Sequence, residues 1–584
     1  MKFSLKSTFK FTVLTTIIVM VTVSNILWRT EKLVGATVVS NSSSTSSSTQ
    51  INYNVGPEKL TANVNVSDVG KPINEDVLGV NQLSAPQDVP LMKELGVQFA
   101  RVDASLEGSF DSVNSYNCQT GVWSSALLSS RVKLVQSAGA QVQLIIDYSP
   151  KCLEQEINNQ VPSNNYGPPD LGSDLPKWES LISQVGTWAI EHNIRYFEVW
   201  NEPDWQFFSG NVQQYNQLYQ NTVIPLEKDA QKLNTKIYVG GPAMADVLDQ
   251  IDSTFLTQFL NFVSANKLPL DFVSWHTYAN DPNAGLASWA PNGLCLTNHV
   301  QTAKIPCYYT PQMSSAIYKT EVEQVKSILS KYPKYHPQLW LDEWNFDAES
   351  DPRMNTPYAS AFLISAIEKA TGAGVNVMEW YNTADSPNQN YQGSGLLNQS
   401  YQPKPSYLGF QLWHMMEGNV VKVVQHVTKA NQYQHGSVYV TKSSGGNLNL
   451  LVNNYVSYDT SGNFGSSPTS ANSLSSSIEI NGLVAGSSYL EVTHTIGLTN
   501  RTSYVISSKK VVADGNGNLK LNLTSQEETT SMITLEPIKS QSLSGSSSNN
   551  TDWLTILLIV VIILIIVTLV LAIKRNKNVK AQNT

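Results

Sequence analysis

Between residue 77 and about residue 416, short runs of β-branched and aromatic residues alternate with longer runs whose apolar positions repeat every three to four residues. Short apolar runs are typical of buried strands, and the longer periodic runs are typical of amphipathic helices. The alternation predicts successive βα units around a parallel sheet. Eight strands are predicted, at residues 78–81, 97–103, 141–147, 194–200, 236–240, 270–277, 338–343 and 375–381.

The helices between these strands carry their own boundary signals. The run 358–371 is followed by Gly372 and Gly374, at a point where a helix C-terminus favours a residue with positive φ. The run 321–331 is preceded by Thr320, which with Glu323 makes a capping-box pattern. Eight βα units in this length predict a closed (β/α)₈ TIM barrel of the α/β class, with an open doubly wound sheet as the alternative.

After residue 417 the pattern changes to alternating strands separated by turns rich in Ser, Gly and Asn. Strands are predicted at residues 437–440, 448–452, 477–480, 489–493, 519–523 and 531–535. This texture predicts a C-terminal β-sandwich. The alternating segment 62–66 lies just ahead of the barrel, and we expect it to join the sandwich; capping the bottom of the barrel is the other possibility.

Two apolar segments near the chain ends suggest the compartment. Residues 11–28 follow three lysines and have the pattern of a signal peptide or an uncleaved signal anchor. Residues 553–573 carry no charge and are long enough to span a bilayer. Because basic residues follow the second segment, the positive-inside rule places the tail in the cytoplasm and the body outside the cell. A buried core helix is the alternative for either segment.

These signals divide the chain into eight parts. They are a signal peptide or anchor (1–30), a Ser/Thr-rich linker (31–58), an N-terminal strand joining the β-sandwich (59–76), the (β/α)₈ barrel (77–416), the β-sandwich (417–537), a Ser/Asn-rich linker (538–552), a transmembrane helix (553–573) and a basic cytoplasmic tail (574–584). The expected location is therefore the cell membrane, crossed once or twice, with the barrel extracellular.

Charge and cysteine usage narrow the functional classes. Lys and Arg total 38 against 46 Asp and Glu, for a net charge of -8, so we expect no nucleic-acid partner. An exterior location permits disulfides. The four cysteines fall into two local pairs, Cys118 with Cys152 and Cys295 with Cys307, and we favour this pairing over free thiols. Asn-x-Ser/Thr triplets are compatible with a glycoprotein and begin at Asn41, Asn65, Asn398, Asn500, Asn522 and Asn549.

The candidate chemistry lies where the predicted strands end, since an active site on a barrel is built at the C-terminal face. The fourth strand ends in Asn201 and Glu202, and the seventh ends in Glu343. Hydrolysis of a glycosidic bond needs two carboxyl groups across one barrel mouth: an acid to protonate the leaving oxygen, and a carboxylate at the anomeric carbon. No metal, nucleotide or serine-hydrolase motif is present, so no cofactor is expected.

The Asn-Glu-Pro that ends strand four, the glutamate that ends strand seven and the His-Thr-Tyr that ends strand six resemble clan A glycoside hydrolases. The likeness is closest to glycoside hydrolase family 39, with its β-xylosidase-like and exopolysaccharide-cleaving members, and covers residues 60–537. The resemblance implies Glu202 as general acid/base, Glu343 as nucleophile and a retaining reaction through a covalent glycosyl-enzyme. It places Asn201 against the sugar 2-hydroxyl.

Other strand-end residues are candidates for support and substrate binding. We expect Arg101 and Tyr278 to hydrogen-bond and orient the carboxylate of Glu343, and His276 to contact a sugar hydroxyl or the nucleophile. Trp380 could offer a flat face to a pyranose ring, with core packing as the alternative. For Trp205, Trp289 and Trp344 a subsite platform and a packing role are equally open.

The leading functional hypothesis is a surface-anchored retaining glycoside hydrolase that acts on the β-glycosidic bonds of an extracellular polysaccharide or oligosaccharide. One alternative is a non-catalytic carbohydrate-binding or adhesion protein of the envelope. Another is a transglycosylase that uses the same site with a sugar in place of water.

Overall fold

The computed structural model describes ten stretches of the 584-residue chain, within the range 58–538. Both apolar segments (11–28 and 553–573), Trp289, Cys295 and Cys307 lie outside the described residues. Within them, none of the helices has the length and apolarity needed to cross a membrane. The described stretches are 58–106, 115–155, 166–248, 250–279, 315–346, 352–385, 393–428, 434–456, 473–497 and 500–538.

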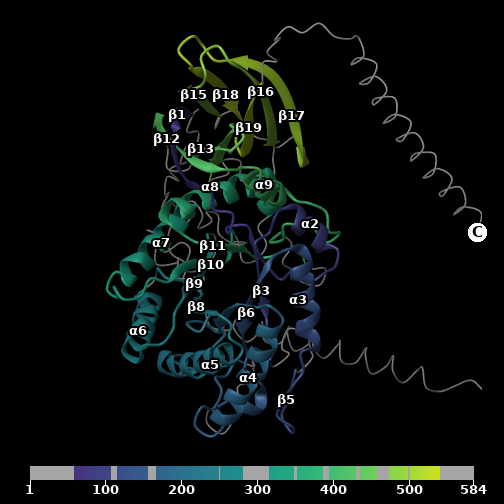
Figure 1. Ribbon diagram of the computed structural model, residues 1–584, viewed down its shortest axis with the longest axis vertical. Coiled ribbons are helices and arrows are strands. Elements are labelled where there is room, and N and C mark those ends of the chain that lie inside the picture. The colour runs from purple at the N-terminus through teal and green to yellow at the C-terminus, as the bar shows by residue number, and fades with distance from the viewer. Residues whose placement is uncertain are drawn as a thin grey trace, which may run out of the picture. The chain divides into compact units, whose positions relative to one another are not determined.

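Eight parallel strands form a closed barrel (Figure 1). The ring closes because β10 pairs with β9 on one side and with β11 on the other, and β11 pairs with β2. The predicted closed barrel is confirmed. Its strands are β2 (Gly79–Asn81), β3 (Phe99–Asp103), β6 (Gln141–Ile146), β7 (Tyr196–Val199), β8 (Tyr238–Met244), β9 (Phe272–Tyr278), β10 (Gln338–Asn345) and β11 (Val377–Trp380).

One α-helix follows each barrel strand. They are α2 (Asp88–Glu94), α3 (Ala126–Ala138), α4 (Leu175–Glu191), α5 (Val212–Lys232), α6 (Gln250–Asn266), α7 (Ala316–Leu329), α8 (Pro357–Ala373) and α9 (Pro405–His414). Thr356 caps the start of α8 by accepting a hydrogen bond from the Tyr358 amide, and Gly374 ends the helix with φ +104°. Short elements in the connections are β4 (Tyr116–Asn117), β5 (Val122–Trp123), η1 (Lys151–Leu153) and η5 (Pro352–Asn355).

The capping box predicted at Thr320 and Glu323 is wrong. Helix α7 begins one turn earlier, after Ser315. Thr320 therefore lies inside the helix, and its hydroxyl donates to the carbonyl of Ala316, one turn before it. A Thr-x-x-Glu pattern within a helix has the same spacing as a capping box, so the pattern alone does not locate the helix start.

The barrel interior is filled in two layers of different character. The lower layer is apolar and contains Phe99, Phe272, Trp340 and Val377, with Tyr196 packed against it. Two residues further along the same five strands, the side chains are polar and buried: Arg101, Ser274, Asp342, Glu379 and Glu198. Because a strand returns to the same face every second residue, these five side chains form a layer directly above the aromatic one.

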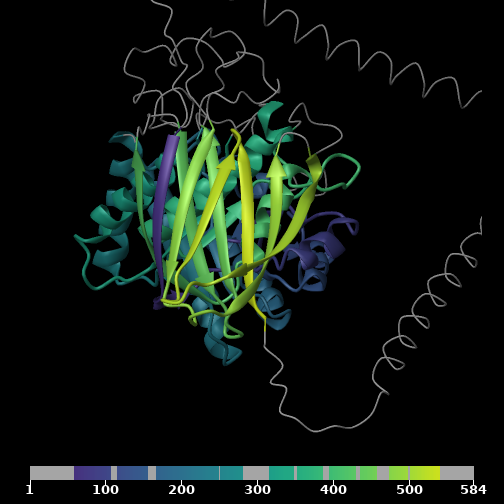
Figure 2. The ribbon, with the colours of Figure 1, turned by 90° about the horizontal axis from the view of Figure 1, so that it is seen from above.

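Nine strands form the C-terminal sheet, in the order β17-β16-β19-β14-β13-β12-β1-β15-β18. The first described strand, β1, lies between β12 and β15, as Figure 2 shows. The strands are β1 (Glu58–Pro72), β12 (Asn419–Thr428), β13 (Gln434–Lys442), β14 (Leu448–Val456), β15 (Leu474–Asn481), β16 (Ser488–Gly497), β17 (Asn500–Val512), β18 (Leu519–Ser525) and β19 (Thr529–Pro537).

This sheet is continuous, where the sequence analysis expects the two layers of a sandwich. Residues from distant parts of the strand order share one apolar cluster, among them Leu521 of β18, Ile478 of β15 and Tyr489 of β16. The sheet therefore curls over its own core and buries one face as a sandwich would.

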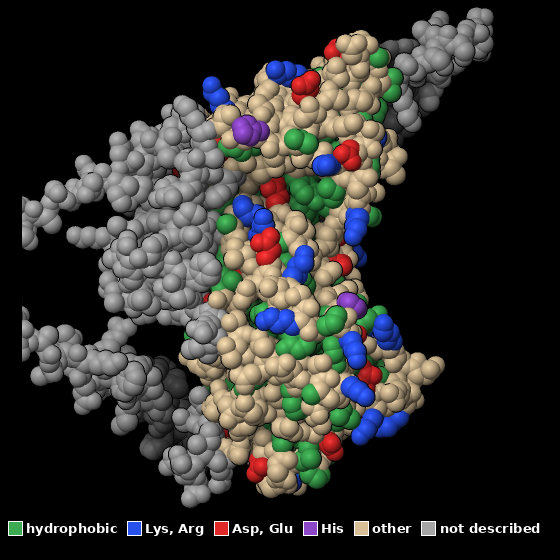
Figure 3. Space-filling model, turned by 90° about the vertical axis from the view of Figure 1, so that its left-hand side faces the viewer, with side chains coloured by type: hydrophobic (Ala, Val, Ile, Leu, Met, Phe, Trp, Pro, Cys, Tyr) green, Lys and Arg blue, Asp and Glu red, His purple; other side chains and the backbone are tan. Residues whose placement is uncertain are grey.

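Barrel and sheet are joined by specific contacts along α8. The buried side chain of Asn453, on β14, donates a hydrogen bond of 2.8 Å to the carbonyl of Ala361. The hydroxyls of Tyr358 and Tyr455 lie 3.1 Å apart beside it. On the face drawn in Figure 3, basic and acidic side chains are interspersed over a surface made mostly of uncharged groups.

Candidate active site

The turn after β7 holds Glu202 in an unusual backbone conformation. Trp200 and Glu202 both have positive φ, at 72° and 45°, which non-glycine residues seldom adopt. Two contacts hold this turn: the indole of Trp200 donates to the Phe207 carbonyl at 2.9 Å, and the Glu202 amide donates to the Ala243 carbonyl at 2.9 Å. A strained backbone conformation persists only where surrounding contacts hold it in place, and such conformations are common at functional sites.

A bulge in β10 brings two consecutive carboxyl groups to the barrel interior. The pairing register between β9 and β10 shifts between Leu341 and Glu343, so Asp342 is the extra residue. In a regular strand the two side chains would point to opposite faces, whereas a bulge re-aims one of them. Asp342 accepts from Gln143 at 2.8 Å across the barrel, and Glu343 faces Arg101 and Tyr278.

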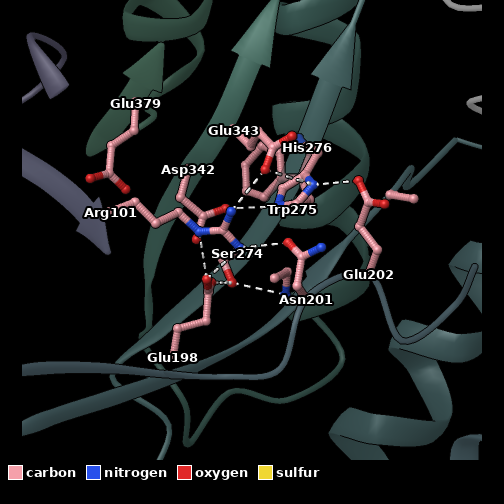
Figure 4. Close-up of polar contacts among 12 residues, drawn as sticks. Arg101, Glu198, Asn201, Glu202, Ser274, Trp275, His276, Asp342, Glu343 and Glu379 are labelled. Carbon is pink, nitrogen blue, oxygen red and sulfur yellow. Dashed lines mark hydrogen bonds and ion pairs between the residues drawn. The ribbon is translucent and has the colours of Figure 1, made fainter. Parts of the chain in front are cut away.

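The two predicted catalytic glutamates lie within reach of one another. One carboxylate oxygen of Glu202, one of Glu343 and a ring nitrogen of His276 all lie within 4.8 Å of each other. Figure 4 shows His276 between the two carboxyl groups. Glu202 is buried and Glu343 is partly exposed. Such a spacing is closer to the arrangement of retaining glycosidases than to the wider one that inverting enzymes need for a water.

Two donors orient the carboxylate of Glu343. The guanidinium of Arg101 donates to Oε2 at 2.8 Å, and the hydroxyl of Tyr278 donates to Oε1 at 2.5 Å. Burial raises the pKa of Glu343, and the positive charge of Arg101 and the hydrogen bond from Tyr278 oppose that rise. Burial next to Glu343 raises the pKa of Tyr278 well above its usual range, so this phenol remains a donor.

His276 contacts Glu202 rather than Glu343. Its Nδ1 lies 2.7 Å from Oε1 of Glu202 and 3.8 Å from Oε2 of Glu343. Burial and the nearby Arg101 charge lower the pKa of His276 well below its usual range, so the ring is neutral. In one tautomer of the neutral ring Nδ1 accepts a hydrogen bond from a protonated Glu202, and in the other it donates a hydrogen bond to an ionised Glu202. The contact therefore suits both protonation states of the carboxyl group.

The spacing of Glu202, His276 and Glu343 would also fit a cation. These side chains already form hydrogen bonds: Glu202 with His276, and Glu343 with Tyr278 and Arg101. The Arg101 guanidinium supplies the positive charge at this point. The arrangement therefore fits proton transfer and charge stabilisation between two carboxyl groups better than metal coordination.

Asn201 is held beside the carboxylate pair by both ends of its amide. Its Oδ1 accepts from Arg101 at 2.9 Å, and its Nδ2 donates to the hydroxyl of Tyr148 at 3.1 Å. The second Nδ2 hydrogen is not used by either contact. It is the group that could meet a sugar hydroxyl, the role that the sequence implies.

Trp380 does not lie in the cleft, which corrects its expected role as a sugar platform. It is fully buried, its indole donates to the Ser394 carbonyl at 2.8 Å, and its ring packs edge-on against Trp344, also fully buried. Successive residues point to opposite faces at a strand end, so the next residue, Tyr381, turns toward Tyr278 instead. Of the other tryptophans considered, Trp205 is 41% exposed, three residues after Glu202.

The first cysteine pair is bonded as predicted. Cys118 and Cys152 form a disulfide with Cα atoms 6.0 Å apart. Cys118 follows β4 in the connection after β3, and Cys152 lies in η1 after β6. The bond therefore ties together two loops at the C-terminal ends of neighbouring barrel strands, the face that carries the carboxylate pair.

A polar layer that was not predicted from the sequence lies beneath the pair. Glu198 accepts from Arg101 at 2.8 Å and from the Ser274 hydroxyl at 2.5 Å, and its side chain is fully buried. In Figure 4, Asp342 and Arg101 lie between Glu198 and Glu379. The signal was present: Glu198, Ser274 and Asp342 each lie two residues beyond an aromatic residue on a predicted strand, so each shares its inward face.

Comparison with known proteins places this geometry in a family. A family model described as glycosyl hydrolases family 39 matches residues 169–498, more than half of the chain. A β-xylosidase of Caldicellulosiruptor saccharolyticus is 26% identical over 263 residues, or 42% of this chain and 48% of that protein. A β-xylosidase of Geobacillus stearothermophilus is 25% identical over 307 residues, or 50% and 54%. The matched region thus spans about half the length of these curated relatives.

Solved structures agree on the fold. A monomeric β-xylosidase from Caulobacter crescentus CB15 has a TM-score of 0.62 at 16% identity, over 82% of this chain and 100% of that chain. The GH39 enzyme from Xanthomonas axonopodis pv. citri has a TM-score of 0.60 at 18% identity, over 82% and 97%. With the matching family model, these findings show that the chain belongs to glycosyl hydrolase family 39.

Proposed function

We propose that this protein is a retaining glycoside hydrolase that cleaves β-linked sugars, with β-xylosides as the first substrates to test. The observation that carries the proposal is the approach of the Glu202 and Glu343 carboxyl groups to within 4.8 Å, each at the end of a different strand of one barrel. Two curated relatives are named β-xylosidases, which supports the choice of sugar.

In this mechanism Glu343 attacks the anomeric carbon while Glu202 protonates the leaving oxygen. The charge of Arg101 and the hydrogen bond from Tyr278 keep Glu343 ionised and aimed. After departure of the aglycone, Glu202 is ionised and takes a proton from the attacking water. Neutral His276 can form a hydrogen bond with Glu202 whether that carboxyl group is protonated or ionised. It therefore supports both the formation and the hydrolysis of the glycosyl-enzyme.

Replacement of each glutamate tests the assignment directly. Glu343→Gly should abolish hydrolysis of aryl β-xylosides, and azide should restore turnover by forming a glycosyl azide of inverted configuration. Glu202→Ala should lower hydrolysis about 10²- to 10⁴-fold for poor leaving groups and give, with azide, a product of retained configuration. Full activity of the Glu343→Gly variant without azide would refute the nucleophile assignment.

We also propose that the enzyme is held at the cell surface, with its barrel outside and polysaccharide or oligosaccharide as its substrate. The uncharged segment 553–573 and the basic residues after it support this location. Protease treatment of intact cells, with immunodetection of the barrel, tests it: the barrel should be digested, whereas complete protection of the barrel would contradict the proposal.

A further inference from the structure

The layer beneath the carboxylate pair differs from the interior of most barrels, which branched apolar side chains fill. Here Arg101, Glu198, Ser274, Asp342 and Glu379 occupy it, and all are buried. A buried charge is costly unless it is paired and hydrogen-bonded. Such a layer close to a catalytic site therefore calls for a functional explanation.

The guanidinium of Arg101 binds one carboxylate within this layer and one in the catalytic pair above it. Arg101 donates through Nε to Glu198 and through Nη1 to Glu343, each at 2.8 Å. Its Nη2 lies 2.8 Å from the same oxygen of Glu198 and donates to Asn201 at 2.9 Å. The other oxygen of Glu198 accepts from Ser274 at 2.5 Å, so Glu198 is fixed on both sides. Its side chain is wholly buried, so it does not touch substrate.

We infer that Glu198 is a positioning residue for the nucleophile, because it shares the Arg101 guanidinium with Glu343 and so limits how strongly Arg101 holds that carboxylate. This inference rests on the proposed function of Glu343. With Glu198 in place, the plane of the guanidinium is anchored from below, and Glu343 keeps enough basicity to attack. Without the charge of Glu198, the whole positive charge of Arg101 faces Glu343.

The other carboxyl groups of this layer do not compete with Glu198 for the positive charge of Arg101. Burial raises the pKa of Asp342, of Glu379 and of Asp147 well above the usual range, so these three carboxyl groups are neutral. Glu343 is faced by Arg101, Tyr278, His276 and Glu198. The titratable groups that face Glu198 are Arg101 on β3, Asp147 after β6, Tyr215 on α5, Asp342 and Glu343 on β10, and Glu379 on β11.

These contacts determine whether the pKa of Glu343 rises or falls when Glu198 is replaced. The negative charge of Glu198 raises the pKa of Glu343, whereas Arg101 lowers it. Glu198→Gln removes the first influence and strengthens the second. The pKa of Glu343 in the free enzyme should then fall, and the acid limb of the kcat/KM profile should move to lower pH by roughly one unit. The plateau should fall roughly tenfold, since the nucleophile is less basic and its partner less well oriented.

The test measures kcat/KM against pH with p-nitrophenyl β-xyloside for the full chain, the Glu198→Gln variant and a matched control, Glu379→Gln. Glu379 lies in the same layer, and among the described residues neither of its buried oxygens has a hydrogen-bond partner. Because the Glu379 carboxyl group is already neutral, Glu379→Gln changes no charge. The acid limb of the kcat/KM profile of this variant should coincide with that of the wild type. Glu198→Asp keeps the charge on a shorter side chain, and its acid limb should lie between those of the wild type and Glu198→Gln.

An acid limb of Glu198→Gln that coincides with those of the wild type and Glu379→Gln would overturn the inference, whatever the loss of stability. If Glu198→Gln yields no folded protein, Glu198→Asp decides: a limb displaced to lower pH supports the inference, and an unmoved limb overturns it. A wild type that hydrolyses no aryl glycoside would overturn the proposed function and this inference together. An active wild type with no displacement in either variant would overturn the inference alone.

Discussion

At the scale of single residues, a small number of polar side chains sets the protonation states of the two catalytic carboxyl groups. Arg101 and Tyr278 hold Glu343, while His276 holds Glu202, so each carboxyl group has its own neighbour. These different partners allow the two groups to differ in protonation state, as a mechanism requires in which one carboxyl group donates a proton while the other attacks as a carboxylate. Tyr278 offers the cleanest single-atom test of this division.

Tyr278→Phe removes only the hydroxyl that donates to Glu343. Because this hydrogen bond lowers the pKa of Glu343, its loss should raise that pKa and move the acid limb of kcat/KM to higher pH. The value on the plateau should fall about 10- to 100-fold, in line with the loss of a hydrogen bond to a charged group. The displacement is opposite in sign to that expected for Glu198→Gln. A Tyr278→Phe profile displaced to lower pH would contradict this account of the site.

At the scale of elements, the barrel was predictable because strand and helix periods differ clearly along residues 77–416. All eight strands lie where the apolar runs predict them, with differences of a few residues at the ends. Two sheet strands were missed. Strand β17 is polar and lies at the edge of the sheet, and β12 has exposed valines such as Val424, at 65% exposure. Neither strand buries a clean alternating face, so the periodicity that marks a strand is weak.

The candidate site was predictable only as far as motifs and strand ends reach. The residues at the ends of the predicted strands do come together at the mouth of one barrel, namely Glu202, Glu343, Arg101, Tyr278 and His276. The bulge at Asp342 depends on the pairing of β10 with its neighbours, which no local pattern reveals. The burial of Trp380 depended on which way the last strand residue points.

The disulfide between Cys118 and Cys152 bears on the stability of the loops on the catalytic face. It closes a span of 34 residues, so replacement of both cysteines with Ala should lower the free energy of unfolding by about 4 kcal/mol. Chemical denaturation of the oxidised wild type and the double variant measures this difference. A loss below about 0.5 kcal/mol would show that the loops are held by their packing alone.

At the scale of the whole described body, barrel and sheet are linked through α8, and the chain enters the sheet at β1 before it forms the barrel. Asn453 joins three elements: it donates to Ala361 on α8, and its Oδ1 accepts from Thr530 on β19 at 2.8 Å. The sheet is therefore expected to unfold together with the barrel rather than as a separate module.

Asn453→Ala should lower the free energy of unfolding by about 1–3 kcal/mol, because it removes two buried hydrogen bonds. The control is Asn449→Ala on the same strand, whose Oδ1 accepts from Thr534 without contact to the barrel among the hydrogen bonds described. Thermal unfolding followed by calorimetry should show one transition for both variants, at the lower temperature for Asn453→Ala. A separate early transition in Asn453→Ala would mean that the sheet unfolds independently.

In the proposed mechanism Glu343 becomes covalently bonded to the sugar. The most direct measurement is incubation of the full chain with 2,4-dinitrophenyl 2-deoxy-2-fluoro-β-xyloside, followed by mass spectrometry of the intact protein and its peptides. We expect one fluoroxylosyl group per chain, bound to Glu343, with loss of activity in step with labelling. Labelling of another residue, or an active enzyme that turns over aryl β-xylosides with inversion and is never labelled, would contradict it.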